Sequence, residues 1–580
     1  MDGLDFFTHP EFTAQKQYEA LRMYYVENKE AAEVAEIFGY RYRAFTSLIT
    51  GFRKSLHENT ASGNFFVQRN PGRHRNKEGH KIKAMAVKLR KRNFSVEDIK
   101  IALDAAGYNV SENTIYLLLK NEGFARLPKR NRQEKHSLDE VKIEAPKSSV
   151  LSFEHEGFKV SSGGIMAILP YIKKYGIDDI INKSQYPQTK TLPRLQSILS
   201  FIALKLSDVR RYSADDLWCM DRGGGLFAGL NVLPKTTWFS SYPDRVTKEM
   251  NFGFLKQLHK TWSEAGLLGD TANLDFTTIP YWGDNEHLEN NWSGKRNKAL
   301  AGMLAVLAHD PDTGIIDYGS ADIKHEDESK VVLEFLDFYR QGAGKAGTLK
   351  YIVFDSKFTN YENLGRLDSN HVKFITIRRR GKNIVDYINN IPEKDWKKIR
   401  IEKPGNKKRG VKVYEETTLL KGYGKDIRQI YITGNGKIKP AIIITNDFDI
   451  SINQVVRKYG KRWLVEKTIS EQIEFFHLNR VTSSMVIKVD FDLTMSILAH
   501  NLYRLLALDL EAYSHLTSQS LYEKFISNSA EIKIEEKQII VGLKKKRNLP
   551  LILEKTKQFE NYKYPWLGNK KLIFQGASYS

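Results

Sequence analysis

The sequence predicts a multidomain α/β protein in which helical segments come first and an interrupted α/β core follows. Three observations carry this prediction. Apolar residues recur at helical spacing in residues 17–57, 80–127 and 160–268, strand-like apolar runs begin near residue 271, and lysine- and arginine-rich strands separate two parts of the core. The length of 580 residues allows roughly three or four domains.

The composition is that of a folded basic protein. Lysine and arginine exceed the acidic residues by 21, while hydrophobic residues make up 41% and aromatic residues 11% of the chain, which argues against a disordered basic tail. We therefore expect a polyanionic partner. The chain has no apolar run of 18 residues, so we expect a soluble intracellular protein with no membrane partner. It has a single cysteine, Cys219, so any metal would be held mainly by oxygen ligands.

Residues 1–60 are expected to form a helix–turn–helix unit. Apolar residues at helical spacing indicate three short helices within residues 17–57, and Gly39 falls where a tight turn needs a permissive residue. The helix after this turn presents Arg41 and Arg43, which are candidates for DNA contact.

Residues 61–127 are expected to form a second helix–turn–helix unit. Ser95 is a candidate helix cap, Gly107 ends that helix, and Ser111 opens the next one, whose Thr114 and Lys120 are the candidate DNA contacts. Such units also serve as packing elements, and only one of the two need contact DNA. Residues 128–150 are polar, charged and without apolar periodicity, and they are expected to be a linker.

The core begins after a helical region. Residues 151–268 are mainly helical in pattern and contain no catalytic group of residues, whereas residues 269–365 show three strands, a helix and a fourth strand, YIVF. This order of elements is that of the ribonuclease-H-like fold, so residues 269–365 are predicted to be the first part of such a core.

Two aspartates stand out in this first part. Asp275 lies within the apolar first strand, and Asp355 directly follows the apolar fourth strand. In the predicted fold these strands are neighbours, so the two carboxylates would converge, and a bound cation would offset the cost of burying them. For either residue alone, a turn at a strand end is the simpler interpretation; for the pair we favour a site.

The remaining chain is assigned in three parts. Residues 366–438 are β-rich and basic and are predicted to be an insertion, with either a solvated face or a surface for the DNA backbone. Residues 439–510 would complete the ribonuclease-H-like core with a last strand and a helix. Residues 511–580 yield only a C-terminal basic region.

The stretch YGKRWLVEKTISEQIEFFH, which begins at Tyr459, holds a third candidate acid. If the stretch is one helix, then Tyr459, Arg462 and Glu466 lie on one face, at spacing i, i+3 and i+7, while Glu471 and Glu474 lie away from it. Glu466 is therefore the candidate that accompanies Asp275 and Asp355.

Asp275, Asp355 and Glu466, in this order and with a β-rich insertion before the glutamate, resemble the DDE transposases of bacterial insertion sequences. Tyr459, Arg462 and Glu466 match the Tyr-x2-Arg-x3-Glu motif of the family-four type. The resemblance covers roughly residues 160–510. It implies that the three acids are catalytic and hold two divalent metal ions, with magnesium expected and manganese as the alternative, and that Tyr459 and Arg462 contact DNA phosphates.

The resemblance also implies the activity and the partners. The expected activity is cut-and-paste transposition: metal-dependent cleavage at the ends of the insertion sequence and strand transfer into target DNA, by a homodimer in a synaptic complex. The expected location is the bacterial cytoplasm, on the nucleoid. The alternatives are a DNA-binding regulator derived from a transposase, and a ribonuclease-H-like nuclease that cuts without joining strands.

One position departs from the family motif. The motif continues with lysine seven residues after the glutamate, and this chain has Ile473 there, within an apolar stripe. If a basic group is still needed, His477 or Arg480 lies further along roughly the same face. The terminal repeats, the target site and the use of hairpin ends are not given by the sequence.

Overall fold

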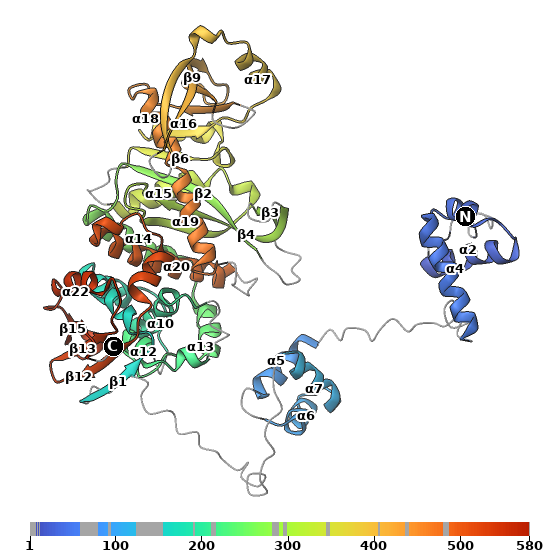
Figure 1. Cartoon of the computed structure of the whole chain (residues 1–580), viewed down its shortest axis with the longest axis horizontal. Helices are drawn as coiled ribbons and strands as arrows, with labels where there is room; N and C mark the ends of the chain where they lie inside the picture. Colours follow the sequence, from blue (N-terminus) through green and yellow to red (C-terminus); the bar gives the residue numbers. More distant parts are fainter. Residues whose placement is uncertain are drawn as a thin grey trace, which may run out of the picture. The chain divides into compact units, whose positions relative to one another are not determined.

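The protein is described by a computed structural model (Figure 1). The described residues are 7, 10, 12–58, 79–90, 94–122, 155–189, 192–209, 216–280, 289–293, 298–343, 349–403, 407–434, 440–478 and 486–578. The chain divides into two compact units, Met1–Lys142 and Ile143–Ser580, and each is described by itself. The predicted linker, residues 128–150, lies outside the described residues.

The first unit begins with three helices around a small apolar core. They are α2 Thr13–Val26, α3 Ala31–Ile37 and α4 Tyr42–His57. Each helix contributes buried side chains, among them Leu21, Val34 and Phe45. Gly39 has a φ of 61°, in the left-handed region that glycine adopts without strain, which confirms the predicted turn between α3 and α4.

A second group of three helices follows in the same unit. They are α5 Gly79–Arg90, α6 Val96–Ala105 and α7 Glu112–Asn121. The Ser95 hydroxyl accepts from the Asp98 backbone N–H at 3.1 Å, and the Asp98 carboxylate accepts from the Ser95 N–H at 2.8 Å. The Ser111 hydroxyl likewise caps α7 by accepting from the Thr114 backbone N–H at 3.3 Å, and Gly107 has a φ of 83°. The predicted caps and turn are thus confirmed.

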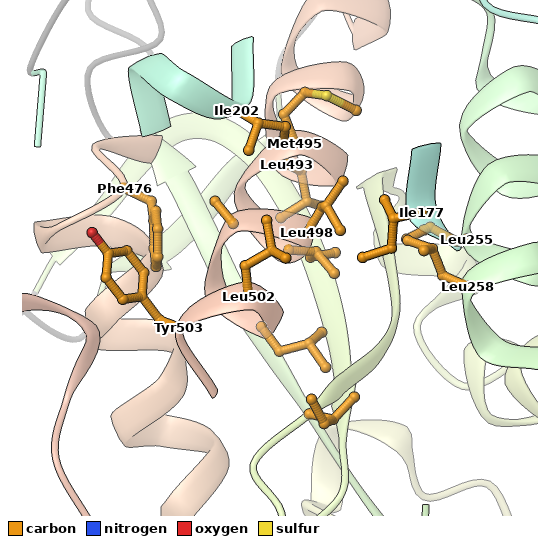
Figure 2. Close-up of a cluster of buried hydrophobic side chains, with 14 of the residues drawn as sticks. Ile177, Ile202, Leu255, Leu258, Phe476, Leu493, Met495, Leu498, Leu502 and Tyr503 are labelled. Atoms are coloured by element: carbon orange, nitrogen blue, oxygen red, sulfur yellow. The ribbon is translucent and has the colours of Figure 1, made fainter. Parts of the chain in front are cut away.

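The helical part of the second unit packs around one long buried helix. The helices are α8 Leu169–Lys174, α9 Ile177–Lys183, α10 Arg194–Leu206, α12 Arg222–Phe227, α13 Thr236–Ser241, α14 Lys248–Glu264 and α20 Val486–Asp509. Figure 2 shows Leu493, Leu498 and Leu502 of α20 amid apolar side chains from the surrounding elements. Between Val489 and Ala507 every residue of α20 except Arg504 is buried, so the helix is covered on all sides.

A large sheet forms the middle of the second unit. Its first part consists of β2 Thr271–Pro280, β3 Asn290–Ser293, β4 Lys298–His309, β5 Ile316–Ile323, β6 Tyr351–Phe354 and β7 Lys373–Ile377, with α15 Val331–Ala343 between β5 and β6 and α16 Tyr361–Ser369 between β6 and β7. Strand β4 is antiparallel to both β2 and β5, whereas β6 is parallel to β2 and β7 is parallel to β6. The spatial order is therefore β5, β4, β2, β6, β7.

The β-rich insertion extends this sheet. After α17 Lys382–Asn389 come β8 Lys397–Lys403, β9 Lys407–Leu419, β10 Asp426–Thr433 and β11 Ala441–Thr445. Strand β11 pairs antiparallel with β7, and the order continues through β10 and β9 to β8. The sheet curls enough for α18 Ile452–Gly460 to contact β6, β7 and β8 (Figure 1). The predicted last strand, β11, thus joins the insertion to the core.

A separate five-stranded sheet lies near the C-terminus. It contains β1 Glu156–Val160, β12 Ala530–Ile534, β13 Gln538–Leu543, β14 Lys563–Tyr564 and β15 Lys570–Gly576, beside α22 Leu549–Lys557. Strand β1 pairs with β12 although Val160 and Ala530 are far apart in sequence. At Gly164 a side chain would meet the Ile526 carbonyl oxygen at 1.9 Å, so this junction requires glycine. Sequence patterns predicted only a basic region for residues 511–580.

Within the described ranges, no helix has both the length and the apolar character needed to cross a membrane.

Candidate active site

Asp275 and Asp355 lie side by side at neighbouring strands. The parallel register of β2 and β6 pairs Leu274 with Phe354, so Asp275 within β2 and Asp355 directly after β6 lie at the same level. Leu274 and Phe354 are fully buried in the main core. Because side chains alternate along a strand, the two carboxylates project from the opposite face of the sheet.

The segments that bear these two acids are held together by an aromatic stack. The Phe276 ring, one residue after Asp275, lies parallel to the Phe358 ring at a centroid distance of 3.9 Å and an interplanar angle of 5°. Each aspartate also accepts a backbone N–H through its Oδ1 atom, Asp275 from Phe276 at 2.8 Å and Asp355 from Ser356 at 2.6 Å. The ring stack on the core face of the sheet, together with these hydrogen bonds, thus fixes the positions of the two acids relative to each other.

Glu466 reaches the same place from a helix pair that crosses the strands. It lies in the first turn of α19 Trp463–Glu474, which packs on β2 and β4. The stretch that begins at Tyr459 was predicted to be one helix, but this is wrong: α18 ends at Gly460 and α19 begins at Trp463. The turn between them is tied to β2 by the Asn273 side-chain amide, which donates to the Lys461 carbonyl oxygen at 3.2 Å.

Arg462, in this turn, connects two of the acids. Its Nη1 donates to Asp275 Oδ2 at 2.8 Å and its Nη2 donates to Glu466 Oε1 at 2.6 Å. The Arg462 and Asp275 side chains are each 14% exposed, whereas the Glu466 side chain is 55% exposed. The guanidinium carbon lies 5.6 Å from the centroid of the Tyr459 ring. The structure thus brings Tyr459, Arg462 and Glu466 to Asp275 even though the helix is interrupted.

The electrostatics of the site favour a cation. Burial raises the pKa of Asp275 to about 6; Glu466 and Asp355 add to the rise, while Arg462 and the Phe276 N–H oppose it. Burial also raises the pKa of Tyr459 to about 12, so its hydroxyl stays protonated and can donate a hydrogen bond at neutral pH. For Arg462, burial lowers the pKa, but Tyr459 and the acids outweigh it and keep the guanidinium charged.

The acids fit a divalent metal ion by their chemistry but not in the arrangement seen. Carboxylate oxygens are the ligands that Mg²⁺ and Mn²⁺ accept in proteins. Among the described residues, however, no group of three His, Cys, Asp or Glu side chains is arranged so that it could hold a metal ion. The positive charge beside Asp275 and Glu466 is supplied by Arg462 instead.

The other acids on α19 differ clearly from Glu466. Glu471 Oε2 accepts from both the backbone N–H and the hydroxyl of Ser518, at 3.0 and 2.8 Å, so it holds the start of α21 Ser518–Leu521. A structural role thus explains Glu471, which the helix-face argument had already set apart from Glu466.

Ile473, the position that departs from the family motif, lies among apolar side chains. Ile473 packs against the main core. His477, one of the two basic candidates, lies with its Nε2 2.8 Å from Asp208 Oδ1. The other candidate, Arg480, lies outside the described residues.

The candidate DNA contacts of the first unit lie on its helices. Arg41 is the N-cap residue of α4 and Arg43 lies in its first turn, and both are exposed. Lys120 is exposed in the last turn of α7, and the Thr114 hydroxyl is 2.8 Å from that of Ser111. Thr114 therefore takes part in the cap of its own helix.

Comparison with known proteins places this site in a recognised domain. Residues 272–502 match the family model described as the transposase DDE domain, and this range contains Asp275, Asp355 and Glu466. The match supports a DDE transposase.

A solved structure offers a weaker likeness. It is described as the cryo-EM structure of the piggyBac transposase synaptic complex with hairpin DNA; it is 11% identical, with a TM-score of 0.35, over 64% of this chain and 82% of that one. A likeness at this level assigns neither fold nor activity. No curated protein matches the chain.

Proposed function

We propose that the chain is a DNA transposase of the family-four type, which cleaves the ends of its own insertion sequence and joins them to target DNA. The observation that carries the proposal is that Asp275 and Asp355 lie at the same level of β2 and β6, and that Arg462 links Asp275 to Glu466, all within the residues that match the DDE domain. The strand order β5, β4, β2, β6, β7 supports a ribonuclease-H-like core for this site.

The three acids have the role of ligands. Asp275, Asp355 and Glu466 would hold two divalent metal ions, expected to be Mg²⁺, which when bound activate the attacking oxygen and stabilise the leaving oxygen in phosphoryl transfer. Tyr459 and Arg462 orient the DNA, because a protonated phenol and a guanidinium both donate to phosphate oxygens. The helical groups α2–α4 and α5–α7 supply the DNA-reading units, with Arg41, Arg43 and Lys120 as exposed cations.

The test uses the full-length chain and a plasmid that carries its gene with the flanking DNA. The variants Asp275→Asn, Asp355→Asn and Glu466→Gln should bind this DNA and lose Mg²⁺-dependent cleavage. Glu471→Gln is the matched control, since Glu471 lies on the same helix but contacts Ser518, and it should still cleave. Cleavage that persists in all three variants would show that the triad is wrongly assigned.

The same assay separates the alternatives. A transposase gives cleaved ends and products in which these ends are joined to a second plasmid. Cleaved ends without joined products would indicate a nuclease, and binding without cleavage in Mg²⁺ or Mn²⁺ would indicate a regulator.

A further inference from the structure

The guanidinium of Arg462 occupies the place between Asp275 and Glu466 where a metal ion bound to both carboxylates would lie. It bonds Asp275 Oδ2 and Glu466 Oε1 at the same time, through two different nitrogens. A Mg²⁺ ion needs its oxygen ligands within about 2.1 Å of itself, and it would repel a guanidinium in contact with the same oxygens. Arg462 and a metal ion therefore exclude each other at Asp275.

Arg462 is not fully satisfied in this position. Its Nε atom is buried and has no hydrogen-bond acceptor among the described residues, although the two Nη atoms are both bonded to acids. A buried N–H group without an acceptor carries an uncompensated desolvation cost. A phosphate can accept two parallel N–H groups from one guanidinium, so it competes well for this side chain.

The backbone of Arg462 is held by contacts that do not involve its side chain. The preceding carbonyl, that of Lys461, accepts from Asn273, and the Arg462 N–H donates to the Tyr459 carbonyl oxygen at 3.0 Å. A change of side-chain rotamer is thus enough to move the charge, without a movement of α18 or α19. Tyr459, whose ring lies beside the guanidinium, is on the turn of helix that precedes it.

We propose that Arg462 closes the acid cluster to metal until a DNA phosphate draws its guanidinium away. Metal ion and DNA then bind cooperatively, because each favours the state in which Arg462 has left Asp275 and Glu466, and the coupling is the same in both directions. This inference rests on the proposed function, since it takes the acids as metal ligands and DNA as the partner.

The test measures Mn²⁺ binding rather than activity. Free Mn²⁺ is followed by electron paramagnetic resonance during titration of the full-length chain, with and without a 30-base-pair duplex, and the duplex alone is titrated for subtraction. Arg462→Gln without DNA should bind Mn²⁺ about tenfold more tightly than the natural chain, or more, and DNA should tighten binding by a similar factor only when Arg462 is present. Each variant is first checked by circular dichroism and thermal melting.

Two further variants keep the outcome interpretable. Lys461→Gln removes the adjacent positive charge, which pairs with Asp312 and touches none of the three acids, so Mn²⁺ affinity should stay as in the natural chain. Arg462→Lys keeps the charge but a single ammonium cannot span both acids, so its affinity should lie in between. If Arg462→Gln does not fold, Arg462→Lys carries the test.

The failures of the two proposals differ. If Arg462→Gln and Arg462→Lys bind Mn²⁺ no more tightly than the natural chain, or if Lys461→Gln gains as much, the closing role of Arg462 is wrong while the metal site stands. If Mn²⁺ binding is absent from every protein, or survives Asp275→Asn unchanged, the acids are not the metal site and the proposed function fails with it.

Discussion

Replacing Asp275 with asparagine should stabilise the metal-free protein at neutral pH, although the change removes an ion pair with Arg462. Burial, with Glu466 and Asp355 nearby, raises the pKa of Asp275 from its ordinary 3.8 to about 6 in spite of Arg462. Each pKa unit corresponds to about 1.36 kcal/mol, so the ionised carboxylate costs about 3 kcal/mol at pH 7. Asparagine fills the same space without this cost.

The stability gained by Asp275→Asn should increase with pH. A carboxyl whose pKa is higher in the folded protein binds more protons when folded, so stability is lost as pH rises from about 4 to about 6. The asparagine variant does not share this loss. Its advantage should be small near pH 4 and complete by about pH 7. For a cooperative unit of roughly 440 residues, about 3 kcal/mol corresponds to a rise in melting temperature of about 3 °C.

The assay is differential scanning calorimetry of the full-length chain between pH 4 and 7.5, with a chelator present. Asp447→Asn is the control of opposite sign. Burial raises the pKa of Asp447, but the hydrogen bond from Tyr351 at 2.5 Å and other contacts outweigh it and lower the pKa, so asparagine there should destabilise the protein at pH 7. The reasoning is refuted if Asp275→Asn melts at or below the natural chain at pH 7, or if its gain is equal at all pH values.

Three further outcomes are expected. Lys205→Met leaves the Asp492 carboxylate buried without its partner at 2.7 Å and should cost about 3–5 kcal/mol in thermal unfolding, most of it regained when Asp492→Leu is added; a small cost for the single change would contradict this. Phe358→Leu removes the stack beneath the two aspartates and should cost about 1–2 kcal/mol, with cleavage reduced more than DNA binding. Ser95→Ala should cost about 1 kcal/mol, seen as faster hydrogen exchange in α6 and unchanged exchange in α4.

The sequence predicted those parts of the fold that depend on local chemistry. The capping serines, the glycines at positive φ and the four-residue strand YIVF are each specified by neighbours within a few residues, and all are present. Asp275 and Asp355 could be singled out because an acid within or directly after a buried strand is costly unless it has a use.

Contacts between residues far apart in the sequence could not be predicted from local sequence patterns. The break between α18 and α19 directly follows Gly460, and it coincides with the bond from Asn273, which is far away in sequence. The pairing of Arg462 with Asp275 also joins positions 187 residues apart. The insertion was expected as a sheet, but its continuity with the core sheet follows from the pairing of β7 with β11, which no local pattern specifies.

The pairing of β1 with β12 has a consequence for how the protein is made. Some 370 residues separate Val160 from its partner Ala530, so a ribosome that adds 5–20 residues per second needs roughly 20–70 s to supply the partner strand. Throughout that time β1 has an unpaired edge in the nascent chain. A product cut short before residue 530 never closes this sheet. The pairing of β1 is thus a late event that only chains translated beyond residue 534 can reach.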